Sequence, residues 1–228
     1  RRSSDLLFLD KEDAMKLSVN DQFEKFETEV LIKMVRPGDV VLDIGAFIGY
    51  YTILFAKLVG EKGKVVAFEP GDESFCLLKK KVEYNQYGNV ELMKAAVSNQ
   101  NGRVSFAVSD HNVMDNNVSY ASGSGLMVPA VTIDELVRKN KWKVSLIKMD
   151  IQGGEYAALQ GMHDTIKRTK HMTVVSEFWP YGLKRAEASA KQMLSFMENL
   201  GFSLYELSES KKEIIPTSKK KLLALYSP

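Results

Sequence analysis

The sequence contains one cysteine, Cys76, among its 228 residues. A single thiol excludes an internal disulfide and a cysteine-based zinc cluster. It is also typical of a reducing compartment, so we expect a cytoplasmic protein. No apolar run approaches the roughly 18 residues that a membrane-spanning helix needs. Lys and Arg number 31 against 29 Asp and Glu, a net charge of +2. A net charge this small does not indicate nucleic acid or an anionic membrane as a partner.

Short apolar segments alternate with amphipathic helical segments along the chain. Five of the apolar segments are expected to be strands, at residues 40–44, 65–68, 90–94, 144–149 and 172–176. Because helical patterns separate these segments, the sequence predicts an α/β fold with a doubly wound, mostly parallel sheet. Segments 202–207 and 222–226 are expected to form a C-terminal antiparallel hairpin, which completes a sheet of seven strands. We expect an N-terminal helical segment at 1–38 and one domain at 39–228.

A glycine turn with the sequence DIGAFIG, residues 43–49, follows the first predicted strand. Gly45 and Gly49 permit positive φ and a close approach of a ligand to the backbone. The spacing departs from the Gly-x-Gly-x-x-Gly of dinucleotide-binding turns. The carboxylate of Asp43 disfavours a diphosphate and suits the ammonium group of an amino acid.

A second acid, Glu69, ends the second predicted strand, where a carboxylate accepts hydrogen bonds from ribose hydroxyls. Glu69 alone would also suit NAD. The combination of Glu69 with Asp43 predicts S-adenosylmethionine as the cofactor.

Segments 40–52, 68–70, 94–98 and 146–155 resemble the FkbM-type methyltransferases, which are class I S-adenosylmethionine-dependent enzymes. Many of them methylate hydroxyl groups of sugars or natural products. The last segment reads LIKMDIQGGE, where the family pattern is Lys-x-Asp-x-Glu-Gly-x-Glu. Lys148, Asp150, Gly153 and Glu155 match this pattern, and Gln152 replaces its first glutamate. The resemblance implies a Rossmann-like O-methyltransferase that acts on a sugar or glycan hydroxyl.

The resemblance also implies a set of cofactor-binding residues. The glycine turn and the start of the next helix would surround the methionine moiety, and the segment at 69–70 would hold the ribose. The backbone at 96–97 would border the adenine, and an acid at position 27 would reach over the cofactor. The full set is Glu27, Asp43, Gly45, Ala46, Phe47, Gly49, Tyr51, Thr52, Glu69, Pro70, Ala96 and Val97.

Four residues are candidates for catalysis. Asp150 follows the fourth predicted strand and is our candidate for the general base or for orienting the acceptor hydroxyl, with a helix N-cap as the structural alternative. Lys148 shares its side of the strand and would bind substrate or form an inner salt bridge. Glu177 is a second acid at a strand end. His111 lies in a polar loop, 109–125, that we interpret as a lid over the acceptor.

Several alternatives remain open at this point. Asp150 and Glu177 would suit Mg²⁺, although we do not expect a required metal. An RNA ribose 2′-O-methyltransferase would need a basic face, for which the lysine clusters at 79–81, 211–212 and 219–221 are candidates. We do not expect a nucleic-acid partner, and a cofactor-binding scaffold without activity is the non-enzymatic alternative. The expected partner is a sugar or glycan acceptor, and the chain would suit a domain of a larger glycan-processing protein.

Overall fold

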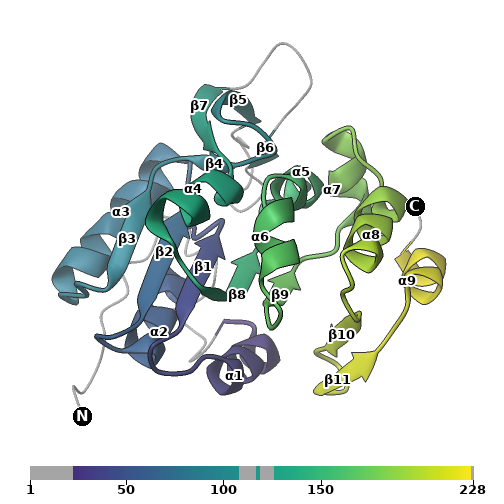
Figure 1. Ribbon diagram of the computed structural model, residues 1–228, viewed down its shortest axis with the longest axis horizontal. Helices are drawn as coiled ribbons and strands as arrows, with labels where there is room; N and C mark the ends of the chain where they lie inside the picture. The colour runs from purple at the N-terminus through teal and green to yellow at the C-terminus, as the bar shows by residue number, and fades with distance from the viewer. Residues whose placement is uncertain (1–22, 108–116, 119–125, 227–228) are drawn as a thin grey trace.

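Five parallel strands form the central sheet of the computed structural model, which describes residues 23–107, 117–118 and 126–226 (Figure 1). The strands are β1 at Val40–Ile44, β2 at Lys64–Phe68, β3 at Val90–Met93, β8 at Val144–Met149 and β9 at Thr173–Ser176. Their order is β3-β2-β1-β8-β9. The order reverses between β1 and β8, so a ligand is expected beyond the carboxyl ends of these two strands.

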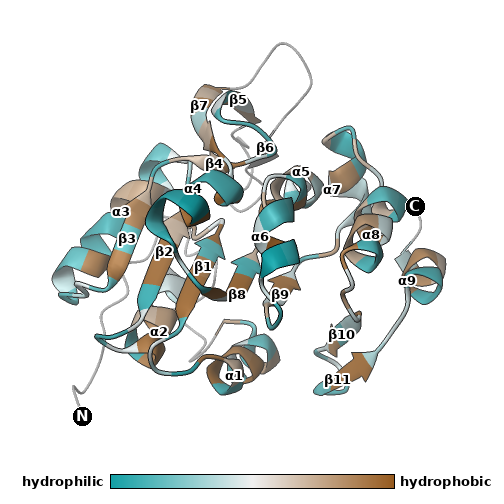
Figure 2. Cartoon of the chain, viewed as in Figure 1, coloured by the Kyte–Doolittle hydropathy of each residue, from teal (hydrophilic) through white to brown (hydrophobic). Residues whose placement is uncertain are grey.

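Helices cover both faces of this sheet (Figure 1). One face is covered by α1 at Lys25–Met34, α2 at Tyr50–Val59 and α3 at Asp72–Tyr84. The other is covered by α4 at Ile133–Asn140, α5 at Glu155–Gln160, α6 at His163–Arg168, α7 at Pro180–Arg185 and α8 at Ala190–Asn199. In Figure 2 the strands of the central sheet are mostly coloured as hydrophobic residues, whereas the helices carry both hydrophobic and hydrophilic residues.

Continuous apolar runs form the central strands because both faces of the sheet are buried. In β1, Val41 packs against α1 and α2, whereas Leu42 and Ile44 pack with the helices of the opposite face. All three are fully buried. The same alternation places Asp43 on the α2 side, beside Lys148 of β8, with which it is paired in the sheet register.

A second, four-stranded sheet lies beside the carboxyl edge of the central sheet. Its strands are β4 at Ala96–Val97, β5 at Gly102–Ala107, β6 at Asn117–Val118 and β7 at Leu126–Val131, in the order β4-β7-β5-β6. Val104, Phe106 and Val128 form its small apolar core together with alanines. This sheet matters for the site because it brings Phe106 to the end of the pocket.

The predicted doubly wound parallel sheet and the C-terminal antiparallel hairpin are confirmed, but the strand count is corrected. The central sheet has five strands rather than seven, because the hairpin forms a separate two-stranded sheet. It pairs β10 at Tyr205–Ser208 with β11 at Glu213–Pro216. Segment 222–226, which we expected to be the second strand, belongs instead to helix α9 at Lys219–Tyr226. The side chain of Ser218 accepts a hydrogen bond from the backbone N–H of Lys221, which favours a helix start there.

None of the helices in the described residues is long and apolar enough to cross a lipid bilayer. The division of the chain at residue 38 stays a prediction, although α1 shares a hydrophobic cluster with α2.

Candidate active site

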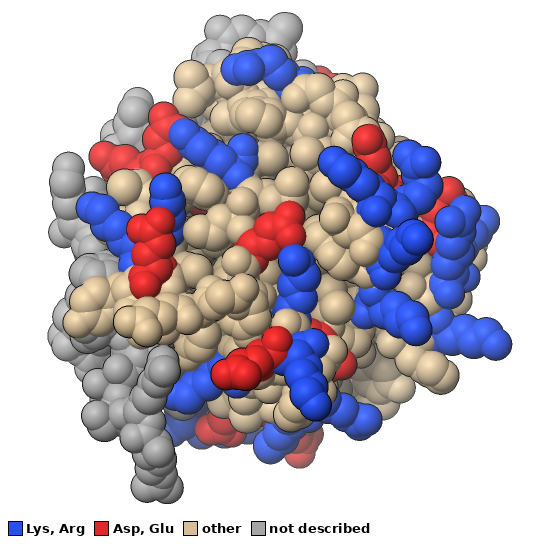
Figure 3. All heavy atoms as spheres, turned by 60° about the vertical axis from the view of Figure 1, so that its left-hand side comes forward, with Lys and Arg blue, Asp and Glu red and all other residues tan. Residues whose placement is uncertain are grey.

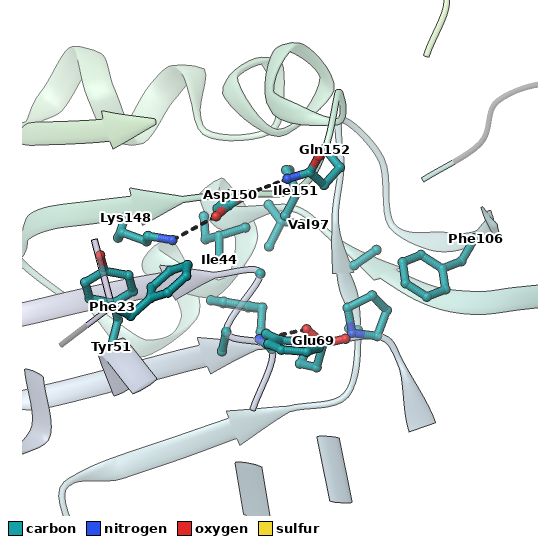
Figure 4. Close-up of a pocket in the computed structure, with 17 residues that line it drawn as sticks. Phe23, Ile44, Tyr51, Glu69, Val97, Phe106, Lys148, Asp150, Ile151 and Gln152 are labelled. Atoms are coloured by element: carbon teal, nitrogen blue, oxygen red, sulfur yellow. Dashed lines mark hydrogen bonds and ion pairs between the residues drawn. The ribbon is translucent and has the colours of Figure 1, made fainter. Parts of the chain in front are cut away.

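A pocket opens beyond the carboxyl ends of β1, β2 and β8, at the point where the strand order reverses (Figure 4). It brings together most of the residues that the sequence pointed to. These are Gly45, Ala46, Phe47, Tyr51, Glu69, Pro70, Ala96, Val97, Lys148 and Asp150. Figure 4 shows Glu69 on one wall, Lys148 and Asp150 on the facing wall, and Phe106 at the far end.

The glycine turn directs its N–H groups toward the protein's own acceptors. Gly45 and Ala46 both donate to the carbonyl of Phe68, at 3.0 and 2.9 Å. Phe47 donates to Oε2 of Glu69 at 2.9 Å. Three backbone donors that would hold a diphosphate in a dinucleotide-binding turn are therefore already engaged.

Glu69 is a buried carboxylate held by two backbone donors. Its Oε2 receives the N–H of Phe47, and its Oε1 receives the N–H of Gly71 at 2.8 Å. Burial raises the pKa of Glu69 to about 7, although both hydrogen bonds act in the opposite direction. Because a carboxylate oxygen accepts more than one hydrogen bond, each oxygen can still receive a ligand hydroxyl.

Gly45 has a φ of +83°, and a Cβ at this position would lie 1.9 Å from the carbonyl oxygen of Asp150. We expect Gly45→Ala to lower the free energy of unfolding by more than about 2 kcal/mol, through backbone strain combined with this overlap. Gly38→Ala is the matched control, since Gly38 has a φ of +90° and none of the described residues comes within 4 Å of where its Cβ would lie. Urea denaturation of both variants measures the difference. Equal losses would show that strain alone matters.

Asp43 lies beneath the pocket rather than on its wall. Its Oδ2 accepts a hydrogen bond from Oγ1 of Thr52 at 2.5 Å, and its Oδ1 is buried with no partner in the described part of the chain. Burial raises the pKa of Asp43, and nearby Lys148 opposes this. Gly49, at φ +87°, also lies outside the pocket, where its position allows close packing against Leu78 of α3.

Lys148, Asp150 and Gln152 form a hydrogen-bonded row along one wall (Figure 4). Nζ of Lys148 donates to Oδ2 of Asp150 at 3.2 Å, and Nε2 of Gln152 donates to Oδ1 at 3.0 Å. The ammonium group also lies 4.6 Å from the ring centroid of Tyr51, a cation–π distance. Burial alone would lower the pKa of Lys148, but Asp150 and Asp43 outweigh it and raise this pKa.

Asp150 is not the N-cap of α5, because Gly154 occupies that position. The helix-capping alternative for Asp150 is therefore wrong, whereas the inner salt bridge predicted for Lys148 is present. Thr52 is buried against Asp43 and does not line the pocket.

Two predicted acids lie near this row without joining it. Burial raises the pKa of Glu27 to about 7, against the opposing effect of Lys148. The backbone N–H of Glu177 donates to the carbonyl of Met149 at 3.1 Å, but its side chain is exposed and does not line the pocket. His111 lies outside the described residues. Across 23–107, 117–118 and 126–226, no group of three or more His, Cys, Asp or Glu side chains is arranged to hold a metal ion.

The pocket also contains residues that were not among the cofactor-binding and catalytic candidates predicted from the sequence. They are Phe23, Ile44, Phe68, Ala95, Phe106, Ile151 and Gln152. Ile151 and Gln152 directly follow Asp150, so their position in the motif was an available signal. Phe106 carries no such signal, because only the docking of the second sheet brings it to the pocket.

We expect the free energy of unfolding to fall as the pH rises from about 5 to 8. Burial raises the pKa of both Glu69 and Glu155 from 4.5 to about 7. Between these values the folded chain holds protons that the unfolded chain has released. Stability therefore falls as pH rises, by up to about 3 kcal/mol per carboxyl. Thermal denaturation across this range measures the slope.

Glu155→Gln is the matched variant for this slope, because the amide oxygen still accepts hydrogen bonds but does not titrate. It should give a shallower dependence than the wild type. A melting temperature that rises between pH 5 and 8 would contradict the prediction.

The family profile of the methyltransferase FkbM domain matches residues 43–204. The chain belongs to the FkbM methyltransferase family. Over 147 residues, this FkbM family member is 27% identical to the hexuronic acid methyltransferase AglP of Haloferax volcanii, covering 64% of the chain and 59% of AglP. Over 124 residues it is 31% identical to the ubiquinone/menaquinone biosynthesis C-methyltransferase UbiE of Teredinibacter turnerae, covering 51% of the chain and 49% of UbiE. The chain thus spans about half to three fifths of the length of these curated relatives.

Among solved structures, methyltransferase FkbM from Methylobacillus flagellatus aligns with this family member at a TM-score of 0.47 and 17% identity, covering 74% of the chain and 44% of that structure. A SAM-dependent methyltransferase from Aquifex aeolicus aligns at 0.47 and 19% identity, covering 87% and 91%.

Proposed function

We propose that this chain is an S-adenosylmethionine-dependent O-methyltransferase that acts on a hydroxyl group of a sugar or glycan. The observation that carries the proposal is the placement of Glu69 and the Lys148–Asp150 pair on facing walls of one pocket. The first wall suits a nucleoside, and the second offers a carboxylate for proton transfer. Both lie at the reversal point of the sheet, where this fold class binds ligands.

The pocket residues fit S-adenosylmethionine better than a dinucleotide. Both oxygens of Glu69 can accept a hydrogen bond from a ribose hydroxyl, and the apolar surface of Val97 and Phe106 suits a base. The N–H groups that would bind a diphosphate are engaged by Phe68 and Glu69. Asp43 does not contribute to this fit, because it lies beneath the pocket and its Oδ1 is buried.

Bound S-adenosylmethionine supplies a methyl group activated by its sulfonium. The contribution of the chain is to orient the acceptor hydroxyl and to take its proton. Asp150 is placed for both, because one further lone pair on each carboxylate oxygen is available for a hydroxyl donor. Lys148 stabilises the ionised carboxylate from 3.2 Å. A general base of this kind contributes about 10²–10⁴-fold, and positioning contributes the rest.

Two observations favour a sugar hydroxyl over RNA. The relative AglP is by name a hexuronic acid methyltransferase. In addition, a basic groove lined by residues of the α4–β8 connection and of α6 lies at the amino-terminal end of β8, whereas Asp150 follows its carboxyl end. Figure 3 shows Lys and Arg side chains crowded along the right of the face in view. Arg138 and Arg168 of this groove lie in the last turns of α4 and α6, where cations stabilise the helix dipole.

The function is tested by two measurements on the same protein. Calorimetry should detect binding of S-adenosylmethionine and none of NAD. Mass spectrometry should then detect a gain of one methyl group on a member of a panel of nucleotide sugars and oligosaccharides, with and without EDTA. Binding of NAD in place of S-adenosylmethionine would overturn the cofactor assignment. Methylation of RNA alone, with affinity that persists at moderate salt, would overturn the acceptor assignment.

A further inference from the structure

The loop after β8 has an unusual backbone for its sequence. Gln152 has a φ of +53° and Gly153 a φ of +104°. A non-glycine residue in the left-handed region is uncommon, and such a conformation persists only where the surroundings hold it. Contacts with the rest of the fold must therefore hold this loop in its conformation.

Hydrogen bonds to Glu155 and packing against α7 hold this loop. Oε1 of the buried Glu155 accepts hydrogen bonds from the N–H of Ile151 at 3.2 Å and the N–H of Gly153 at 3.1 Å. Gly153 also packs against α7, where a Cβ would lie 2.3 Å from the carbonyl oxygen of Gly182. Any side chain at position 153 would push the loop off α7. Glu155 and Gly153 thus fix the backbone on both sides of Gln152.

This backbone turns the Gln152 side chain back over the strand end (Figure 4). Its Nε2 donates to Oδ1 of Asp150 at 3.0 Å, while Nζ of Lys148 donates to Oδ2 at 3.2 Å. With one donor on each oxygen, the carboxylate is restrained from rotating about its Cβ–Cγ bond. The remaining lone pairs then point in fixed directions into the pocket.

We propose that Gln152 is a positioning residue that fixes the plane of the Asp150 carboxylate, and that Glu155 holds Gln152 in place through the loop backbone. The part of this inference that concerns catalysis rests on the proposed function. The link between the two side chains does not, since it is a property of the chain without cofactor or acceptor.

A neutral donor at position 152 suits the charge around Asp150. Within the described residues, the charged groups that influence this region come from five elements or their ends, and only one of them is a cation. They are Lys148 of β8, Asp43 of β1, Glu24 and Glu27 of α1, Glu155 of α5 and Glu177 after β9. A second carboxylate about 3 Å from Asp150 would favour a shared proton. The amide of Gln152 orients Asp150 without adding negative charge.

The link is tested by NMR of the ¹⁵N-labelled wild-type chain and Asp150→Asn. We expect the side-chain amide resonances of Gln152 to move between the wild type and Asp150→Asn, because the acceptor of the amide N–H changes from a carboxylate to an amide. The amide of Gln160, an exposed residue at the end of α5, is the internal control and should keep its position in both proteins. Gln152 amide resonances at the same position in both proteins would overturn the proposal.

The catalytic part is tested with Gln152→Met and the matched control Gln160→Met. Gln152→Met removes the amide donor to Asp150 without adding charge, so we expect it to lower kcat by about tenfold to a hundredfold while KM for the acceptor and affinity for S-adenosylmethionine stay near wild type. Gln160→Met should behave like the wild type in all three measurements.

Wild-type kcat in Gln152→Met would overturn the catalytic role. Absence of methyl transfer in the wild type would instead count against the proposed function, and the NMR result would still decide the link between Gln152 and Asp150.

Discussion

Asp150→Asn is expected to lower the rate of methyl transfer by about 10²–10⁴-fold while affinity for S-adenosylmethionine stays within about twofold. An amide keeps the size of the side chain and can still accept one hydrogen bond, but it cannot take a proton from a hydroxyl. Asp150 has no hydrogen bond to the glycine turn through its side chain, so cofactor binding should not depend on its charge. Single-turnover kinetics with the acceptor found in the screen, together with calorimetry, separate the two effects.

Glu177→Gln is the companion to this experiment, because Glu177 is the other acid that the sequence placed at a strand end. Its side chain is exposed and does not line the pocket, so we expect less than about a threefold loss. Full activity in Asp150→Asn together with a large loss in Glu177→Gln would move the base assignment to Glu177.

Glu69→Ala is expected to weaken binding of S-adenosylmethionine by at least about 100-fold. A buried carboxylate that accepts hydrogen bonds from two ribose hydroxyls contributes on the order of 1.5–3 kcal/mol per bond. The change also leaves the N–H of Phe47 without its acceptor and so loosens the glycine turn. Isothermal titration calorimetry measures the loss.

Glu73→Ala is the matched control for Glu69→Ala, since Glu73 is an exposed acid in the first turn of α3. It should bind S-adenosylmethionine like the wild type. Melting temperatures of both variants separate lost binding from lost folding. Tight binding by a folded Glu69→Ala variant would refute the assignment of this carboxylate to the ribose.

The sequence predicted which residues meet in the pocket where that placement follows from a position at a strand end. Glu69 and Asp150 both end strands of one parallel sheet, so their convergence follows from the topology. The same argument brought Lys148 beside Asp150 through the two-residue period of a strand. Asp43 differs, because that period also turns its side chain to the α2 face, where Thr52 binds it.

Other features depend on tertiary contacts that no local pattern contains. Phe106 reaches the pocket only because the second sheet docks at the carboxyl edge. The conformation of Gln152 depends on Glu155 and on the contact of Gly153 with α7. The C-terminal strand was assigned to the wrong segment because the apolar residues at 222–226 also suit a helix, and the cap at Ser218 decides in favour of the helix.

The contact between Gly45 and the carbonyl oxygen of Asp150 has a consequence for how this enzyme family member can change. The N–H of Asp150 also donates to the carbonyl of Ile44, at 3.0 Å. Backbone touches backbone here, with no intervening side chain whose replacement could adjust the spacing. A mutation that shifts the glycine turn must therefore shift the residue proposed as the base by a similar amount. Residues on the other walls of the pocket can therefore change, and the choice of acceptor with them. The spacing between the glycine turn and Asp150 stays constrained.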